Sequence, residues 1–412
     1  MQEQARYAVG LDVGTTTVRC VVGHIDGTGA PTIVGVGEAP NNGMRKGTVV
    51  NIVNTAQAID KALEVAERMS GYQVNEATVS INGSHVIGMS SRGVIAIAAT
   101  GHEIDGHDLA RVEEAATVMQ LPANREILEV TPRAYQLDGQ DNIKDPLGMT
   151  GVRLEVDAHV ITALSPNVKN LLKACELTQT RVRRPVLAGI AAAKIGLSQQ
   201  LLENGVVLID IGGTTTNIAV YEEGDLQHVS VLPVGSVNIT NDLAIGLKTD
   251  LSVAEEIKLK HVALGRDGTK DIEVTVGKEK LKFSSRDVDE IVEARCEEIF
   301  EIINKELKSI GRAAKLPGGV VLCGGGSLIH GLADFAKNAL QLPARVVKIS
   351  GFAGMQENIN SPAFATVLGL MMLDLENESH HAGGDRAGSE NVLNTIKDLG
   401  GKFSHLLGRF KS

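Results

Sequence analysis

The chain has 412 residues, of which 43% are hydrophobic and 22% charged, as is typical of a globular protein able to bury a sizeable core. Its 40 lysines and arginines against 50 acidic residues give a formal net charge of −10, which argues against the chain-wide basic field of a nucleic-acid-binding protein. The length predicts about two or three domains.

Two kinds of segment are missing from the sequence. It has no basic and apolar leader, and no apolar run approaches the roughly 18 residues of a membrane span, so we expect neither export nor a transmembrane helix. The cysteines lie far apart and the histidines form no HExxH pattern. This spacing predicts neither a disulfide framework nor a zinc site, and it fits a reducing cytoplasm.

The N-terminal half mixes strands and helices. The segments YAVGLDVG, TVRCVVGHI and PTIVGVGEAP predict a β-meander, and Asn51 to Met69 predict an amphipathic helix. Residues 76–163 change to short β-rich pieces around one helix at 105–119, which indicates an inserted α/β module. Helices are then predicted over 166–178 and 188–202.

The C-terminal half repeats this mixture. After a strand and turn at 206–220 come a helical stretch, a hairpin-like IEVTVGKEKLKFS and a long helix from Arg286 to Leu307. A buried strand, a triple glycine and a helix follow in GGVVLCGGGSLIHGLADFAKNAL, and SPAFATVLGLMMLDL predicts a further helix. The polar residues 376–390 indicate a flexible linker.

One short pattern occurs twice. VVLIDIGGTTTNIAV, Val206 to Val220, is a near copy of YAVGLDVGTTTVRCVV, Tyr7 to Val22, which indicates an internal duplication. A glycine turn between two strands presents backbone N–H groups suited to phosphate, and the threonines add hydroxyl donors. An aspartate at the strand end can hold hydrated Mg²⁺. Two such hairpins would clamp a polyphosphate, whereas the alternative for either alone is an ordinary turn.

A third glycine turn, Gly324 to Gly326, follows a buried strand. Three such turns favour a nucleotide site on which they converge. None of them matches the Walker A pattern or GxGxxG, so a P-loop or Rossmann site is disfavoured.

These three turns resemble the ATP site of the actin, sugar kinase and heat-shock chaperone superfamily, and nearly the whole chain is similar to its FtsA family. GVGEAPNNGMRKGTVVN, RAYQLDGQDNIKDPLGMTGVRLEVDAHVITA and the β-rich module carry the FtsA resemblance. It implies an α/β, actin-like ATPase fold, with two duplicated α/β domains around a nucleotide cleft, a β-rich inserted subdomain and a C-terminal amphipathic helix.

The resemblance also implies the ligands, ATP and Mg²⁺, with the ion held through water by Asp12 and Asp210. Thr214 stands where relatives often have a third glycine. Glu255 and Lys258 are implied to contact adenine or ribose, and a solvated helix salt bridge is the equal alternative. The implied nucleotide-binding residues are Asp12, Gly14, Thr15, Thr16, Asp210, Gly212, Gly213, Thr214, Thr215, Glu255, Lys258, Gly324, Gly325, Gly326 and Ser327.

The same resemblance divides the chain into subdomains. The first core subdomain is expected at 1–75, 164–202 and 361–375, the insertion at 76–163, the second core at 203–242 and 318–360, a nucleotide-side subdomain at 243–317, the linker at 376–390 and the tail at 391–412.

The tail forms one apolar stripe at helical spacing with a basic polar face, a pattern typical of an amphipathic helix in the interface of an anionic membrane. Four basic side chains stand against the acidic Glu390 and Asp398. The alternative is that this helix folds back onto the core. The expected membrane contacts are Leu393, Ile396, Leu399, Phe403, Leu406, Leu407, Phe410, Lys397, Lys402, Arg409 and Lys411.

The FtsA resemblance implies an ATP-binding division protein on the cytoplasmic side of the bacterial inner membrane, at the septum. It would assemble into filaments, anchor FtsZ polymers through residues 242–317, and recruit later division proteins, with slow or no ATP hydrolysis and no nucleic-acid partner. No water-positioning residue stands out from spacing. The alternatives are a pilus-assembly adaptor resembling PilM and a small-molecule kinase of the same superfamily.

Overall fold

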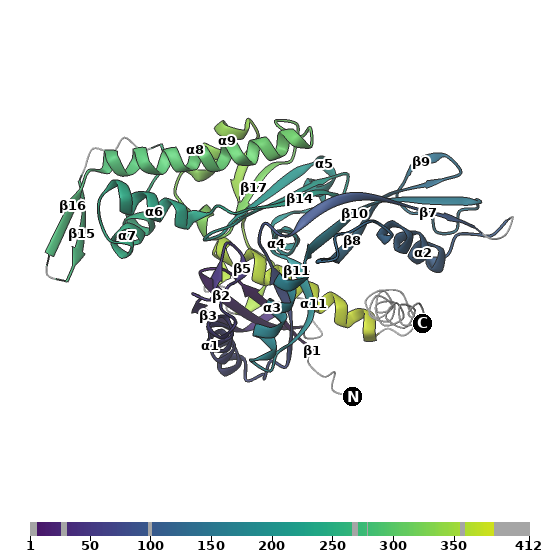
Figure 1. The fold of residues 1–412 in the computed structure, drawn as a ribbon, viewed down its shortest axis with the longest axis horizontal. Coiled ribbons are helices and arrows are strands. Elements are labelled where there is room, and N and C mark those ends of the chain that lie inside the picture. The colour runs from purple at the N-terminus through teal and green to yellow at the C-terminus, as the bar shows by residue number, and fades with distance from the viewer. Residues whose placement is uncertain are drawn as a thin grey trace, which may run out of the picture. The chain divides into compact units, whose positions relative to one another are not determined.

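The computed structural model describes residues 6–25, 31–97, 101–265, 271–277, 279–354 and 359–382. The chain divides into two compact units, which are described separately below (Figure 1). The first unit contains residues 1–88, 123–128 and 161–376, and the second is built mainly on 89–122 and 129–160.

The first unit contains a six-stranded sheet in the order β11-β6-β1-β2-β3-β19. The three N-terminal strands pair antiparallel, whereas β6 joins β1 in parallel and β11 joins β6 in parallel. The strands are β1 (Arg6–Val13), β2 (Thr17–Ile25), β3 (Pro31–Pro40), β6 (Glu76–Ile81), β11 (Arg181–Leu187) and β19 (Ala353–Gly354). A two-stranded ribbon, β4 (Met44–Arg45) and β5 (Thr48–Val49), follows β3.

A second, five-stranded sheet in the same unit has the order β14-β13-β12-β17-β18. Its hairpin strands again pair antiparallel and the last two join in parallel. The strands are β12 (Val206–Ile211), β13 (Thr216–Glu222), β14 (Asp225–Leu232), β17 (Gly319–Cys323) and β18 (Ala344–Val346). The orders β3-β2-β1-β6-β11 and β14-β13-β12-β17-β18 are equivalent, so the expected duplication is confirmed.

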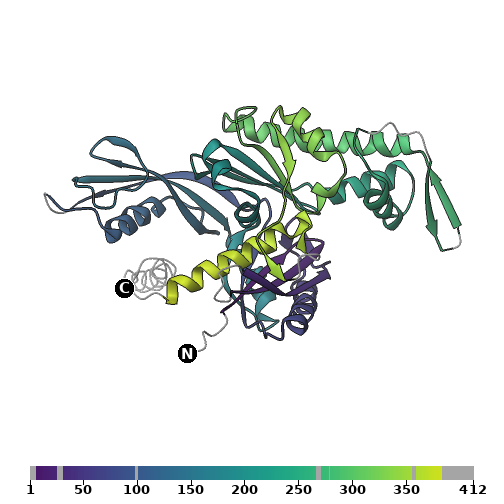
Figure 2. The same cartoon turned by 180° about the vertical axis from the view of Figure 1, so that it is seen from behind.

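Helices cover both sheets. α1 (Ile52–Ser70) packs on β2 and β3, and α11 (Ala365–Ala382) crosses β1 so closely that a Cβ on Gly10 would lie 2.2 Å from the Val367 carbonyl oxygen (Figure 2). The side chain of Asn51 caps α1 by accepting the Asn54 N–H. The remaining helices around the sheets are α3 (Ser165–Glu176), α4 (Ala188–Gly196), α5 (Gln199–Asn204) and α9 (Leu332–Leu340).

A helical cluster extends from the second sheet. α8 (Ser285–Ser309) packs against α6 (Ser236–Gly246) and buries an apolar stripe, and Figure 1 shows the β15–β16 hairpin at the end of this cluster. α7 (Leu251–His261), β15 (Ile272–Val276) and β16 (Glu279–Phe283) complete it. The short 3-10 helices η1 (Gly325–Leu328) and η2 (Pro362–Phe364) lie near the end of β17.

The second unit is a four-stranded sheet in the order β7-β10-β8-β9, covered on one face by α2 (Gly106–Thr117). Leu154, Val156 and Ala158 alternate along β10 toward this helix, so Glu155 and Asp157 face the other way. The strands are β7 (Ile87–Ala96), β8 (Arg125–Leu137), β9 (Gln140–Ile143) and β10 (Arg153–Leu164).

Three expectations differ from the observed elements. The insertion was expected to begin at residue 76, but β6 lies inside the first sheet, where its run ATVSI is buried. The helix expected over 188–202 is two helices, α4 and α5, because the chain is extended at Leu197 and Ser198. Part of the expected linker at 376–390 is helical, since α11 continues to Ala382.

Within helix α11, Glu376 pairs with Lys194 of α4 at 2.6 Å. The predicted tail, residues 391–412, lies outside the described residues. Among the helices of the described ranges, none has the length and apolar character needed to cross a membrane.

Candidate functional site

The first predicted phosphate loop is the turn between β1 and β2. A Cβ on Gly14 would lie 2.6 Å from the Thr17 carbonyl oxygen, so only glycine fits there. Asn41 donates from its side chain to the Gly14 carbonyl and from its backbone to the Thr16 carbonyl, both at 2.9 Å. Because the N–H and C=O of a trans peptide point in opposite directions, the Thr15 N–H points away from Asn41. The loop therefore presents a donor on its other side.

The second loop, between β12 and β13, is held in a similar way. The N-terminus of α6 supplies the donors: Ser236 N–H reaches the Gly212 carbonyl at 2.9 Å, and Val237 N–H reaches the Gly213 carbonyl at 2.7 Å. The Gly213 and Thr214 N–H groups consequently point away from α6. Thr214 has no positive φ, so the residue that replaces a third glycine adds no backbone strain.

The side chain of Thr214 also has a feature that bears on ligand binding. Its hydroxyl oxygen is buried and has no hydrogen-bond partner within the described residues. A buried hydroxyl without a partner costs free energy, and phosphate oxygens or the water shell of a metal ion would satisfy it. This is a feature that a nucleotide would explain.

The two aspartates of the repeated hairpins interact. Burial raises the pKa of Asp12, which Ser80 and Arg19 partly offset. Burial, followed by the charge of Asp12, raises the pKa of Asp210 to about 7, although a hydrogen bond from Asn217 (3.0 Å) opposes this shift. Two carboxylates that repel each other, Asp210 buried and Asp12 half-buried, form a set that a hydrated divalent cation would stabilise.

The third glycine turn packs directly on the second loop. Gly324 has φ +80°, and a Cβ there would lie 2.3 Å from Asp210 Oδ1 and 2.5 Å from the Ile211 carbonyl oxygen. The Gly324 N–H donates to the Pro362 carbonyl (3.1 Å), and the Ser327 hydroxyl donates to the Gly324 carbonyl (2.7 Å). A Cβ on Gly325, in contrast, would meet nothing within 4 Å.

The two phosphate loops also lie against each other. A Cβ on Gly213 would lie 2.6 Å from Thr16 Cγ2, and Asn82 Nδ2 donates to Thr215 Oγ1 at 3.3 Å. The structure thus brings the two hairpins and the third turn together, as the sequence predicted.

The Glu255–Lys258 pair forms, with the lysine buried and the Glu255 side chain 41% exposed. Lys258 is only 8% exposed, and its Nζ donates to Glu255 (2.7 Å), to the Thr240 hydroxyl (2.9 Å) and to the Ser236 carbonyl (3.4 Å). This buried ammonium therefore lies against α6, the helix whose N-terminus donates to the second phosphate loop. No contact with a base or ribose follows from these bonds alone.

Several residues of this region were missed by the sequence reasoning. Arg19 lies directly opposite Asp12 across β1–β2, and Asn217 lies opposite Asp210 across β12–β13. Each stands seven positions after its aspartate, so the hairpin register could have identified both. Ser80 of β6 and Asn82, which directly follows this strand, are in contrast adjacent to the loops only through the parallel pairing of β6 with β1.

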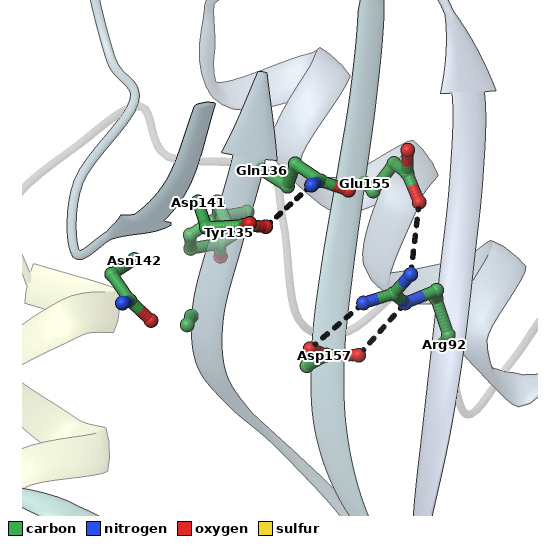
Figure 3. A pocket seen from close by; sticks show the side chains of 8 residues that line it. Arg92, Tyr135, Gln136, Asp141, Asn142, Glu155 and Asp157 are labelled. Carbon is green, nitrogen blue, oxygen red and sulfur yellow. Dashed lines mark hydrogen bonds and ion pairs between the residues drawn. The ribbon is translucent and has the colours of Figure 1, made fainter. Parts of the chain in front are cut away.

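The second unit contains a separate hollow of about 280 Å³ on the open face of its sheet (Figure 3). Arg92 is the one basic residue among the described residues that line it, and it pairs with Asp157 at 3.0 Å and with Glu155 at 3.5 Å. Nothing in this hollow resembles a catalytic set.

Three possible metal ligands lie close together in the same unit. Donor atoms of His102, Asp105 and Asp108 lie within 4.8 Å of one another. The spacing of these residues in the sequence did not indicate a metal site. Asp105, however, caps α2, and Asp108 pairs with Arg111 at 3.1 Å. These contacts account for the cluster as the start of a helix.

Comparison with known families gives two matches. The model described as "Cell division protein FtsA" matches residues 207–369, and the "SHS2 domain inserted in FTSA" matches residues 83–162. The second match begins after β6, in agreement with the corrected start of the insertion.

Individual relatives extend along most of the chain. The chain is 33% identical over 385 residues to the cell division protein FtsA of Pseudomonas aeruginosa, covering 92% of this chain and 91% of the relative. It is 37% identical over 374 residues to FtsA of Bacillus subtilis, covering 90% and 83%. FtsA of Escherichia coli K12 is 32% identical over 387 residues, covering 91% of each.

Solved structures show the fold. A chain of the PilM–PilN type IV pilus biogenesis complex has a TM-score of 0.67 at 18% identity, covering 89% of this chain and 98% of that chain. MreB5 of Spiroplasma citri bound to ADP has a TM-score of 0.55 at 14% identity, covering 92% and 99%. The predicted actin-like fold is therefore confirmed.

Proposed function

The chain belongs to the FtsA family of cell division proteins, and we propose on this basis that it is an ATP-binding adaptor of the division machinery. Its role in division follows from the family. The single observation that carries ATP binding is the convergence of both phosphate loops and the third glycine turn on the Asp12–Asp210 pair.

Magnesium and the phosphates would be bound by this chain's own groups. Asp12 and Asp210 would hold the water shell of the ion, while Thr214 and the outward N–H groups of the two loops would bind phosphate oxygens. The ion, when bound, supplies positive charge that lowers the repulsion between the two carboxylates and the phosphates.

The finer proposal concerns assembly. We propose that ATP-loaded copies polymerise, that residues 242–317 contact FtsZ, and that the basic, amphipathic tail at 391–412 attaches the assembly to anionic lipids of the inner membrane at the division site. Many weakly binding tails on one filament would bind together far more tightly than one tail does. Later division proteins would then gather on this assembly.

The two alternatives share the fold with this chain. PilM is similar at 18% identity, which shows the fold alone, whereas the FtsA relatives are 32–37% identical along about nine tenths of the chain. A kinase would need a substrate pocket with a base, and the site described above is built for phosphate and metal.

Co-sedimentation with vesicles containing anionic lipid tests the adaptor role. The full chain should pellet with the vesicles, more so with Mg-ATP, and should carry FtsZ with it, while a chain ending at Glu390 should stay in solution. Equal pelleting of both chains would reject the tail as the membrane anchor. Vesicle binding without FtsZ recruitment would reject the FtsZ contact.

A further inference from the structure

The end of strand β6 and the residue that follows it contact both halves of the nucleotide site. Ser80 lies in β6, which runs parallel to β1, and Asn82 comes directly after the last residue of the strand, Ile81. The Ser80 hydroxyl accepts the Val13 N–H at 2.9 Å, next to the first loop. Asn82 Nδ2 donates to Thr215 Oγ1 in the second loop at 3.3 Å. This short stretch of chain therefore contacts both repeated hairpins.

The Asn82 side chain is held in its orientation. Its Oδ1 accepts the N–H of Gly83 at 2.8 Å, so the amide can turn only its NH₂ group to Thr215. Thr215 is 4% exposed, and replacement of the Asn82 amide by water is therefore restricted. The contact fixes the second loop relative to the sheet that carries the first.

A second path leads from Asn82 to the first loop. Gly83 has φ +110° and packs on Gly47, where a Cβ would lie 2.6 Å from the Gly83 nitrogen. The Gly47 N–H in turn donates to Thr15 Oγ1 at 3.0 Å. The turn after β6 is thus connected, through Gly47, to the threonine hydroxyl of loop one.

The same turn leads into a clamp, which we call the neck and define by His85, Arg125 and Thr162. Arg125 Nη2 donates to the His85 carbonyl (2.8 Å) and to the Thr162 carbonyl (3.0 Å), and Arg125 Nε donates to Thr162 Oγ1 (3.2 Å). These residues lie on the three segments of the first unit at which the chain passes into or out of the second unit. The neck begins three residues after Asn82.

We propose that Asn82 is a positioning residue that holds the second phosphate loop for nucleotide and couples the nucleotide site to the neck. This rests on the proposed ATP binding. Since a shift of Thr215 on ligand binding acts on Asn82, and Asn82 directly precedes the Gly83–His85 turn, nucleotide and neck influence each other reciprocally.

The test compares Asn82→Ala with Ser84→Ala, an exposed residue of the same turn, in the full chain. Calorimetry with Mg-ATP should show about tenfold weaker binding for Asn82→Ala, the effect of one lost buried hydrogen bond, and wild-type binding for Ser84→Ala. Hydrogen exchange should show Mg-ATP protecting amides 83–88 and 123–128 in the wild type, with this protection lost in Asn82→Ala.

Asn82→Asp separates the loss of the hydrogen bond from a general folding defect. It keeps the shape of the side chain, removes the donor and adds a negative charge beside the proposed phosphate site. It should bind Mg-ATP more weakly than Asn82→Ala. Wild-type affinity and neck protection in both Asn82 variants would overturn the proposal. Absence of Mg-ATP binding by the wild-type chain would instead reject the proposed function.

Discussion

The carboxylate of Asp12 raises the pKa of Asp210, although the two residues belong to different copies of the repeated hairpin. With burial, this repulsion brings the pKa of Asp210 to about 7 from 3.8. At pH values between these two pKa values, the Asp210 carboxyl is therefore protonated in the folded protein but ionised in the unfolded chain. Stability of the ligand-free protein should fall as the pH rises from about 4 to about 7.

Asp210→Asn should reduce this slope and raise the free energy of unfolding above pH 7 by a few kcal/mol, because it removes a buried charge that Asp12 repels and that Asn217 only partly stabilises. Urea titrations at a series of pH values measure the effect, with Asp60→Asn on the exposed face of α1 as the control. Mg²⁺ should raise the melting temperature of the wild type more at pH 8 than at pH 6, and should not affect Asp210→Asn. An unchanged slope would contradict the interaction.

The third glycine turn gives a second prediction. Gly324→Ala places a Cβ 2.3 Å from Asp210 Oδ1 at a residue whose φ is +80°, so the turn or the second loop must shift. We expect a loss of about 2–4 kcal/mol in stability and at least about tenfold weaker Mg-ATP binding. Gly325→Ala meets no protein atom within 4 Å and should leave stability unchanged, which makes it the control for the stability measurement.

Local patterns predicted the phosphate loops because each loop is one short turn between two strands. The repeated Asp-Gly-Thr segments and the Gly324 turn could be read directly, and the duplication explained their convergence. Ser80 and Asn82 could not be found this way, because only the parallel pairing of β6 with β1 brings them to the loops. β6 itself was assigned to the insertion, since a buried apolar run does not indicate which sheet it joins.

Long-range polar contacts were equally invisible in the sequence. Asp374 of α11 accepts the Val9 N–H at 3.0 Å and the Thr78 hydroxyl at 2.6 Å, and it pairs with Arg183 at 3.0 Å. It is 1% exposed. The segment SPAFATVLGLMMLDL predicted a helix here, but not that one acid on it would connect three strands.

This buried acid supplies a third prediction. Asp374→Ala removes the acceptor of the Val9 N–H and the ion-pair partner of the Arg183 guanidinium. This loss should cost about 3–5 kcal/mol of stability. Glu376→Ala on the same helix removes a half-exposed ion pair with Lys194 and should cost less than about 1 kcal/mol. Equal losses in denaturant titrations of the two variants would show that the Asp374 network does not stabilise the sheet.

A substitution of Lys258 tests whether the Glu255–Lys258 pair contributes to nucleotide binding or is only a helix salt bridge. Its ammonium is buried beside α6, which also holds the second phosphate loop, so we expect it to contribute positive charge to nucleotide binding. Lys258→Met should weaken Mg-ATP binding by about tenfold while changing stability little, because an apolar side chain of similar length can fill a buried ion-pair position. Lys260→Met, which removes an exposed pair on the same helix, is the matched control. If Lys258→Met lowers the melting temperature but leaves the dissociation constant unchanged, the pair serves only to join α6 and α7.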